Sequence, residues 1–244
     1  MKNQRVIFAK RPLGEPDDDC FRFDEIDVPE LKDNEILVKV CWLSLDPYMR
    51  GRMNDGKSYA DPMQIGDVMT GESSGIVIKS TSDKFAVGEY VAVHKGWQSY
   101  VVCGADDKRL MKIDITNGSL SAHLGVVGMP GRTAYFGLSE VGKPQVGETL
   151  VVAAASGAVG SAVGQIAKIL GLRAVGIAGG LEKCRYVTEE LGFDACIDYK
   201  ADNFTKELKA ACPDGVDIYF ENVGGAVTKE VAQLLNPGAR VPIC

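Results

Sequence analysis

The sequence predicts an α/β protein with two domains: a compact β-barrel-like domain in residues 1–120 and a doubly wound parallel sheet in residues 121–244. Two patterns support this. Short runs rich in Val, Ile and aromatic residues, separated by turn residues, fill the first half. Strand-like and helix-like segments then alternate to the end of the chain, as βαβ units do. Glycine is also enriched, at 28 of 244 residues, so turns and close backbone approaches are expected.

Five short strands are expected in the first domain. Each combines β-branched and aromatic residues, and clusters of Gly, Pro, Asp or Lys separate one from the next, as in residues 11–19 and 83–89. The predicted strands are VIFA (6–9), EILVKVCWLSL (35–45), GIVI (75–78), YVAVH (90–94) and SYVVC (99–103).

The second domain is expected to alternate five strands with four helices. Its strands are nearly continuous apolar runs, which is typical of a parallel sheet covered by helices on both faces. The predicted strands are 149–155, 173–178, 194–199, 216–223 and 239–244, and the predicted helices are 158–170, 181–192, 203–212 and 226–235. Because the sequence ends on strand-like residues, we expect it to be truncated relative to its natural fold unit.

Charge and cysteine content exclude several classes of function. The net charge is −6 and there is no basic run, so neither a nucleic acid nor a membrane surface is an expected partner. The seven cysteines are widely spaced, odd in number and without a Cys-x-x-Cys motif. This favours reduced thiols in a cytoplasmic setting. No apolar targeting segment is visible at the N-terminus.

A glycine-rich turn follows the first strand of the second domain. Residues 155–160 read A-S-G-A-V-G, which is the Gly-x-Gly-x-x-Gly fingerprint with alanine in the first place. Gly157 would let the backbone approach a pyrophosphate, and Gly160 would let the helix pack closely on the strand. The start of that helix offers free N–H groups to phosphates. The pattern predicts a dinucleotide site; the alternative is a packing role for the glycines.

The end of the second strand indicates which dinucleotide is bound. An NAD enzyme usually carries Asp or Glu there to bind the ribose 2′-hydroxyl, but this sequence has Ala178, Gly179 and Gly180. Lys183 follows at the start of the next helix. A missing acid and a nearby cation favour the 2′-phosphate of NADP. In the alternative interpretation Lys183 is a solvated residue and Glu182 supplies the acid.

Metal and nucleophile chemistry are not expected. The only histidines are His94 and His123, no cysteine lies near another, and a zinc site needs about four clustered ligands. Both histidines are interpreted as surface or loop residues. A Gly-x-Ser-x-Gly motif is absent, which argues against an α/β-hydrolase.

Several longer stretches resemble one family. The sequence is similar to the zinc-free NADPH-dependent double-bond reductases of the medium-chain dehydrogenase/reductase superfamily, the alkenal, prostaglandin and, most closely, bacterial curcumin reductases. This resemblance implies a GroES-like catalytic domain followed by a Rossmann domain. The matching stretches are LSLDPYMRGRM (43–53), GDVMTGESSGIVIKS (66–80), GMPGRTAYFGL (128–138), ETLVVAAASGAVGSAVGQIAK (148–168), VGIAGGLEKC (175–184) and DIYFENVGG (217–225).

The resemblance implies reduction of the carbon–carbon double bond of α,β-unsaturated ketones or aldehydes, with hydride from NADPH going to the β-carbon. Tyr48 would face the substrate carbonyl, although it could equally be a packed aromatic with a satisfied hydroxyl. Tyr59, in the loop 54–63, is a further implied substrate contact. The implied cofactor set is Gly157, Ala158, Val159, Gly160 and Ser161 at the pyrophosphate, Lys183 and Tyr199 at the 2′-phosphate, and Asn222, Met129 and Thr133 at the nicotinamide end.

The sequence departs from the family at its C-terminus. Family members continue for about a hundred residues beyond the strand that begins at residue 239, and their dimers form largely through that part. We therefore expect the full-length parent to be a homodimer, while activity of these 244 residues by themselves stays open. Two other functions remain: a non-catalytic, crystallin-like NADPH-binding protein and a quinone reductase.

Overall fold

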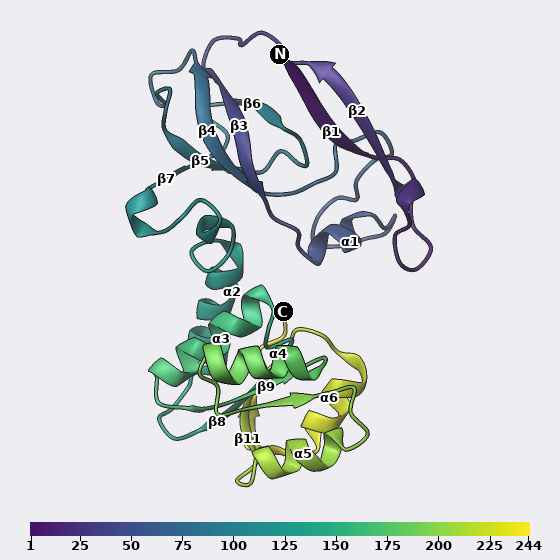
Figure 1. Ribbon diagram of the computed structural model, residues 1–244, viewed down its shortest axis with the longest axis vertical. Helices are drawn as coiled ribbons and strands as arrows, with labels where there is room; N and C mark the ends of the chain where they lie inside the picture. The colour runs from purple at the N-terminus through teal and green to yellow at the C-terminus, as the bar shows by residue number, and fades with distance from the viewer. The chain divides into compact units, whose positions relative to one another are not determined.

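The computed structural model describes residues 1–244, which divide into two compact units, Met1–Leu124 and Gly125–Cys244. The first unit contains two sheets and the second contains one (Figure 1). Each unit also has its own hydrophobic core. They are described separately below. The assignment of substrate and cofactor roles to the two domains stays a prediction at this point.

The first unit is built from two antiparallel sheets. β1 (Lys2–Phe8) pairs with β2 (Phe21–Asp27) along its whole length. A five-stranded sheet has the order β6-β3-β4-β5-β7. Single bridges from Arg5 to Gln98 and from Ile7 to Val68 tie β1 to the loops of the larger sheet. The strands of that sheet are β3 (Glu35–Leu43), β4 (Ser73–Ser80), β5 (Tyr90–Val93), β6 (Tyr100–Gly104) and β7 (Met111–Ile113).

The sequence predicted five of these seven strands and missed β2 and β7. β2 reads FRFDEID and has no fully buried residue, so its charged composition hid its pairing with β1. β7 has only three residues. The helical segments here are short: η1 (Asp18–Cys20), α1 (Tyr48–Arg52), η2 (Ile115–Asn117) and η3 (Ala122–Leu124).

The second unit contains a five-stranded parallel sheet of order β10-β9-β8-β11-β12. From β8 the chain first builds outwards through β9 and β10, then returns to the other side of β8 for β11 and β12. This is the strand order of a Rossmann sheet, as the sequence predicted. The strands are β8 (Thr149–Ala153), β9 (Arg173–Ala178), β10 (Ala195–Asp198), β11 (Val216–Phe220) and β12 (Leu235–Arg240).

Helices cover both faces of this sheet (Figure 1). Leu150 and Val152 of β8 pack in a cluster with α2, α3 and the helix after β9, whereas Val151 and Ala153 pack in a cluster with α5 and α6. No helix of the protein has both the length and the hydrophobicity that a membrane span requires. The helical segments are α2 (Met129–Phe136), η4 (Gly137–Gly142), α3 (Ala158–Ile169), α4 (Leu181–Arg185), η5 (Tyr186–Glu190), α5 (Phe204–Ala211) and α6 (Gly225–Ala232).

Two elements of this unit differ most from the sequence prediction, and one helix was missed. The helix expected over 181–192 is α4 followed by the π-helical turn η5, which ends at Glu190. The last strand was expected at 239–244, but β12 begins at Leu235 and ends at Arg240. Its segment contains Pro237 and Gly238, which usually indicate a turn, yet an outermost strand tolerates them. The helix α2 had not been predicted.

Gly164 of α3 makes a close contact with the segment that leads into β10. A Cβ at this position of α3 would overlap the ring of Phe193, which is buried in the core. We expect Gly164→Ala to lower the free energy of unfolding by about 1–3 kcal/mol, because the ring must move within a close-packed core. Gly51 in α1 has open space around it, so Gly51→Ala should be neutral or stabilising by up to about 1 kcal/mol. Denaturant unfolding of both variants checks this; equal effects would contradict it.

Candidate cofactor and substrate sites

The candidate cofactor site lies along the carboxyl ends of the strands in the second unit. The strand order reverses between β8 and β11, and in open α/β sheets ligands bind outside the carboxyl ends at such a point. Four turns meet along this edge, one after each of β8, β9, β10 and β11. They carry most of the residues that the sequence predicted for the cofactor, so the topology brings together positions that are far apart in the chain.

The turn between β8 and α3 leaves backbone donors exposed at the start of the helix. Ala154 adopts a left-handed conformation, with φ of 52°, and its carbonyl accepts a hydrogen bond from Gly157 N–H at 2.9 Å. Gly157 is the N-cap of α3, and no side chain caps the helix. The first-turn N–H groups of residues 158–160 have no intrahelical acceptor, and the helix dipole adds partial positive charge there. These groups fit a pyrophosphate.

Gly160 has the packing role that the fingerprint predicts. A Cβ at Gly160 would overlap the carbonyl of Ala154 and lie 2.9 Å from the Cα of Ala155. A Cβ at Gly157 would be 3.1 Å from the carbonyl oxygen of Ala154, a tight but far less severe contact. Gly160 therefore lets α3 begin directly against the strand. The next residue, Ser161, donates N–H to Gly157 O at 2.9 Å, and its hydroxyl lies 3.4 Å from Ala158 O.

The ends of β9 and β10 form a second part of the site. A Cβ at Gly179 would lie 2.9 Å from the ring of Tyr199 and 3.1 Å from Cε of Lys200, so these side chains stand beside the glycine tip of β9. The Asp198 carboxylate accepts hydrogen bonds from the N–H groups of Gly180 and Lys200, both at 2.9 Å. These two bonds hold the pKa of Asp198 below its usual value. Asp198 thus orders both turns.

Two lysines at this end have no ion-pair partner. Lys183 is exposed on α4, and the Lys200 ammonium lies 5.9 Å from the Tyr199 ring centroid. The sequence reasoning found Lys183 and Tyr199 but missed Lys200, for which the only signal was its position directly after the third strand. Glu182, the acid of the alternative interpretation, lies in the first turn of α4. The tip of β9 carries no acid of its own, and the Asp198 carboxylate that reaches it from β10 is bonded to Gly180 N–H. Unpaired cations beside a glycine tip fit a 2′-phosphate.

Asn222 follows β11 at the point where the strand order reverses. Its side-chain amide donates to Ala153 O at the end of β8, at 3.0 Å, so it joins the two central strands. The buried Glu221 beside it accepts hydrogen bonds from side chains and backbone; the sequence reasoning did not single it out. Met129 and Thr133 lie one turn apart on α2, which packs on α3, and the Thr133 hydroxyl is 3.7 Å from Met129 Sδ.

The candidate substrate residue Tyr48 belongs to the first unit and begins α1. Its hydroxyl is buried and has no hydrogen-bond partner, which normally costs about 1–3 kcal/mol. Its ring stacks on that of His94, with centroids 6.2 Å apart. The packing interpretation expected a satisfied hydroxyl, and the structure does not supply one. A buried donor without a partner in its own chain is instead suited to a ligand acceptor.

The surroundings keep both rings neutral at physiological pH. Burial, with smaller contributions from Asp46 and Glu72, raises the pKa of Tyr48 to about 12. Burial followed by nearby arginines lowers the pKa of His94, and its Nε2 lies 3.3 Å from the Thr70 hydroxyl. His94 is in a loop, as expected, although it is half-buried. Tyr59 is 85% exposed and near enough to affect the pKa of Tyr48.

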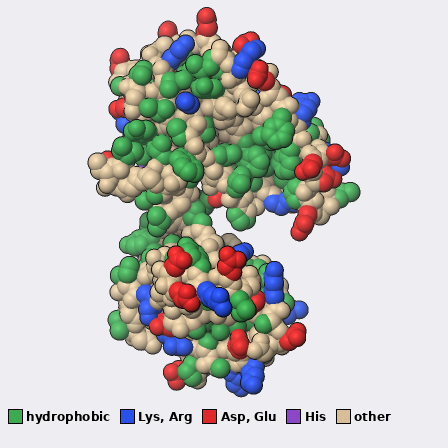
Figure 2. Space-filling model, viewed as in Figure 1, with side chains coloured by type: hydrophobic (Ala, Val, Ile, Leu, Met, Phe, Trp, Pro, Cys, Tyr) green, Lys and Arg blue, Asp and Glu red, His purple; other side chains and the backbone are tan.

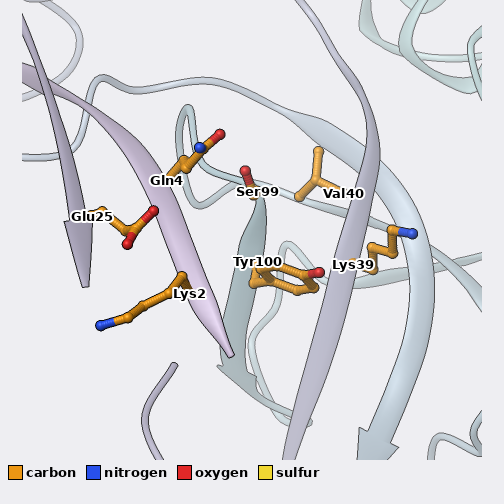
Figure 3. Close-up of a pocket in the computed structure, with 7 residues that line it drawn as sticks. All are labelled: Lys2, Gln4, Glu25, Lys39, Val40, Ser99 and Tyr100. Atoms are coloured by element: carbon orange, nitrogen blue, oxygen red, sulfur yellow. The ribbon is translucent and has the colours of Figure 1, made fainter. Parts of the chain in front are cut away.

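Other features of the structure contain none of the predicted site residues. A cavity of about 370 Å³ in the first unit opens beside β1 (Figure 3). Acidic and basic side chains are interspersed over the face shown in Figure 2. No group of three or more His, Cys, Asp or Glu residues is arranged to hold a metal ion; the prediction that no metal takes part is not tested by this. The cavity is lined by Lys2, Gln4, Glu25, Lys39, Val40, Ser99 and Tyr100.

Comparison with known proteins identifies the family. The family model described as the N-terminal domain of oxidoreductase matches residues 4–113, and the one described as zinc-binding dehydrogenase matches residues 158–244. The NADPH-dependent curcumin reductase of Escherichia coli (strain K12) is 50% identical over 243 residues, covering 100% of this chain and 70% of the relative. The chain belongs to the medium-chain dehydrogenase/reductase family.

Two further similar proteins of this family are also linked to NADP by their names. The 2-alkenal reductase (NADP(+)-dependent) of Nicotiana tabacum is 39% identical, covering 100% of this chain and 72% of the relative. The crystal structure of CurA in complex with NADPH from Vibrio vulnificus is 48% identical, with a TM-score of 0.94, covering 99% of this chain and 71% of that one. The resemblance seen in the sequence is thereby confirmed: the chain falls among the NADP-dependent oxidoreductases of the medium-chain dehydrogenase/reductase family.

The raised pKa of Tyr48 predicts a specific alkaline instability. The folded protein holds this proton up to about pH 12, whereas the unfolded chain releases it near pH 10. The stabilisation is therefore present below pH 10 and is lost as the pH rises towards 12. In Tyr48→Phe the free energy of unfolding should fall less steeply over that window. Urea unfolding of both proteins between pH 9 and pH 11.5 measures the difference; a constant gap across the window would contradict the assignment.

Proposed function

We propose that this protein reduces the carbon–carbon double bond of α,β-unsaturated ketones or aldehydes at the expense of NADPH. One observation carries the proposal. The uncapped N–H groups at the start of α3 and the two unpaired lysines that follow β9 and β10 lie along the same edge of the parallel sheet. The similarity of the chain to the NADPH-dependent curcumin reductase and the 2-alkenal reductase supports the same reaction. The preferred substrate within this class is left open.

In this proposal the residues of the second unit hold NADPH along the strand ends. The N–H groups of residues 158–160 would bind the pyrophosphate, with Ser161 next to them. Lys183, Tyr199 and Lys200 would surround the 2′-phosphate, since charge-assisted bonds to phosphate are the strong ones. Asn222, Met129 and Thr133 would contact the nicotinamide end. NADPH, when bound, supplies the hydride for the reaction.

In the first unit, Tyr48 is proposed to donate a hydrogen bond to the substrate carbonyl. Its hydroxyl is buried and unpartnered, and its pKa near 12 keeps it protonated, so it can donate at any physiological pH. A donor fixed before the reaction stabilises negative charge that develops on the carbonyl oxygen as hydride reaches the β-carbon. The resulting enolate then takes up a proton at the α-carbon, which gives the saturated product. Tyr59 is proposed as a second substrate contact. A small-molecule enone is the only partner that the proposal requires.

Two other functions use the same fold and are separated by one assay. A quinone reductase would oxidise NADPH with a quinone more readily than with an enone, and a non-catalytic NADPH-binding protein would oxidise it with neither. The likeness to the curcumin and 2-alkenal reductases favours the enone reaction over the non-catalytic alternative, and the Tyr48 hydroxyl, which has no hydrogen-bond partner, is free to serve it. The homodimer expected for the full-length parent stays a prediction.

The lysines at β9 and β10 predict a preference for NADPH over NADH. Removing one charge-assisted contact to the 2′-phosphate costs about 1.5–3 kcal/mol, which is about ten- to a hundredfold in affinity. Lys183→Ala and Lys200→Ala should each weaken NADPH binding by that factor and leave NADH binding unchanged. The matched control is Lys206→Ala, which removes an exposed lysine on α5. This variant should bind both cofactors as the wild type does. Equal affinities of the wild type for the two cofactors would refute the assignment.

An isotope experiment tests the proposed reaction itself. NADPH deuterated at C4 of the nicotinamide, incubated with the protein and an enone, should give a saturated ketone labelled at the β-carbon. The position of deuterium is read by NMR of the product. An allylic alcohol as the main product would show reduction of the carbonyl and would overturn the proposal.

The matched variant for this experiment is Tyr48→Phe, which keeps the ring and removes the donor. Its product should carry the same label, while kcat falls by ~10²–10³-fold, as on removal of one oxyanion donor. Turnover equal to the wild type would remove Tyr48 from the site.

A further inference from the structure

A buried carboxylate stands directly beside the proposed nicotinamide contact. Glu221 is only 6% exposed and follows the last residue of β11. Its Oε1 accepts hydrogen bonds from the N–H groups of Val223, at 2.5 Å, and Gly224, at 2.7 Å. Its Oε2 accepts hydrogen bonds from the hydroxyls of Tyr219, at 2.5 Å, and Thr228. No cation pairs with it, so this carboxylate is held entirely by neutral donors.

The hydrogen bonds keep Glu221 ionised although it is buried. Burial acts to raise its pKa, but the bonds from Thr228, Tyr219 and the two backbone N–H groups outweigh it, so the pKa lies below the usual value. The same arrangement, after burial, raises the pKa of Tyr219. The carboxylate also sits next to the N-terminus of α6, whose N-cap Gly224 has no side-chain cap, and negative charge is favoured there.

The bonds of Glu221 determine the path of the turn between β11 and α6. Gly224 and Gly225 follow with φ of 81° and 69°, a left-handed pair that glycine adopts readily. On the other side, the Glu221 backbone N–H donates to Pro242 O at 2.8 Å, and its carbonyl accepts from Cys244 N–H at 3.0 Å. Asn222 is thus the one side chain in this turn that reaches across to β8. Glu221, directly before it, is held by hydrogen bonds to both its side chain and its backbone.

We propose that Glu221 is a positioning residue for the nicotinamide half of the cofactor, acting through Asn222. It rests on the proposed function, because that function places Asn222 against the nicotinamide end. The proposed 2′-phosphate end lies two and three strands away from β11, at β9 and β10, and is ordered separately by Asp198. Loss of the Glu221 charge should therefore affect one half of the cofactor and spare the other.

Two ligands separate these halves in a binding experiment. NADPH engages both ends of the site, whereas 2′,5′-ADP has the adenosine and the 2′-phosphate but no nicotinamide. Glu221→Gln keeps the side-chain volume but turns one acceptor oxygen into an NH₂ donor that faces donors. We expect it to weaken NADPH binding about tenfold or more and to change 2′,5′-ADP binding by less than twofold, both measured by calorimetry.

Further variants distinguish positioning from a general loss of structure. Asn222→Ala should give the same pattern, and the double variant should bind NADPH no more weakly than Asn222→Ala does, because Glu221 acts through Asn222. The matched control is Glu230→Gln. Glu230 is an acid on α6 that accepts a hydrogen bond from the Thr205 hydroxyl at 2.9 Å, and its variant should bind both ligands as the wild type does. If Glu221→Gln fails to fold, Thr228→Val keeps the carboxylate, removes one donor and should show a smaller loss of NADPH binding alone.

The outcomes are distinct. Equal weakening of both ligands by Glu221→Gln, unchanged binding of both, or additive losses in the double variant would overturn the positioning role while leaving the proposed function intact. If the wild type bound neither NADPH nor 2′,5′-ADP, the proposed function would fail, and this inference would fail with it.

Discussion

The burial of the central strand β8 is the constraint on which the second unit depends. Thr149 is 4% exposed and the other four residues of the strand are fully buried, and alternate side chains pack into the two separate clusters on opposite faces of the sheet. No polar ligand can be bound on either face without breaking one of these clusters. The strand ends are the remaining place where polar groups can collect without leaving buried donors or acceptors unsatisfied. Hence the candidate site is an edge made of turns.

The turns along this edge differ in what orders them. The turn after β8 is ordered by backbone contacts: Gly160 permits the close approach of α3, and Ala154 accepts the left-handed conformation that the approach requires. The turns after β9 and β10 share the carboxylate of Asp198, and the turn after β11 is ordered by Glu221. The side chains that order the other turns, Asp198 and Glu221, are ones that a ligand does not need to contact. The side chains left over, such as Lys183 and Asn222, are available for binding.

These particulars explain how far the sequence could predict the structure. The fingerprint at 155–160, the Gly179-Gly180 tip and the alternation of elements are local patterns, and they predicted a parallel sheet with a dinucleotide site. Lys200 and Glu221 were missed because their roles depend on contacts between separate turns. The segment β2 was missed because charged residues line it, and the last strand was predicted to begin four residues too late because Pro237 and Gly238 stand inside β12. The unsatisfied hydroxyl of Tyr48 could not be foreseen, since a missing partner leaves no pattern in the sequence.

An acidic chain that binds a highly charged anion needs its carboxylates kept away from that anion's charge. The net charge here is −6, and at physiological ionic strength only exposed charges more than about 8 Å apart are largely screened. The two carboxylates that order the turns, Asp198 and Glu221, are occupied by backbone and hydroxyl donors, and both have lowered pKa values. Their negative charge is thus directed into N–H and O–H groups of the turns. The ammonium groups of Lys183 and Lys200 form no ion pair, although the charge of Lys200 contributes to the lowered pKa of Asp198, so both ammonium groups remain available to an anion at this edge.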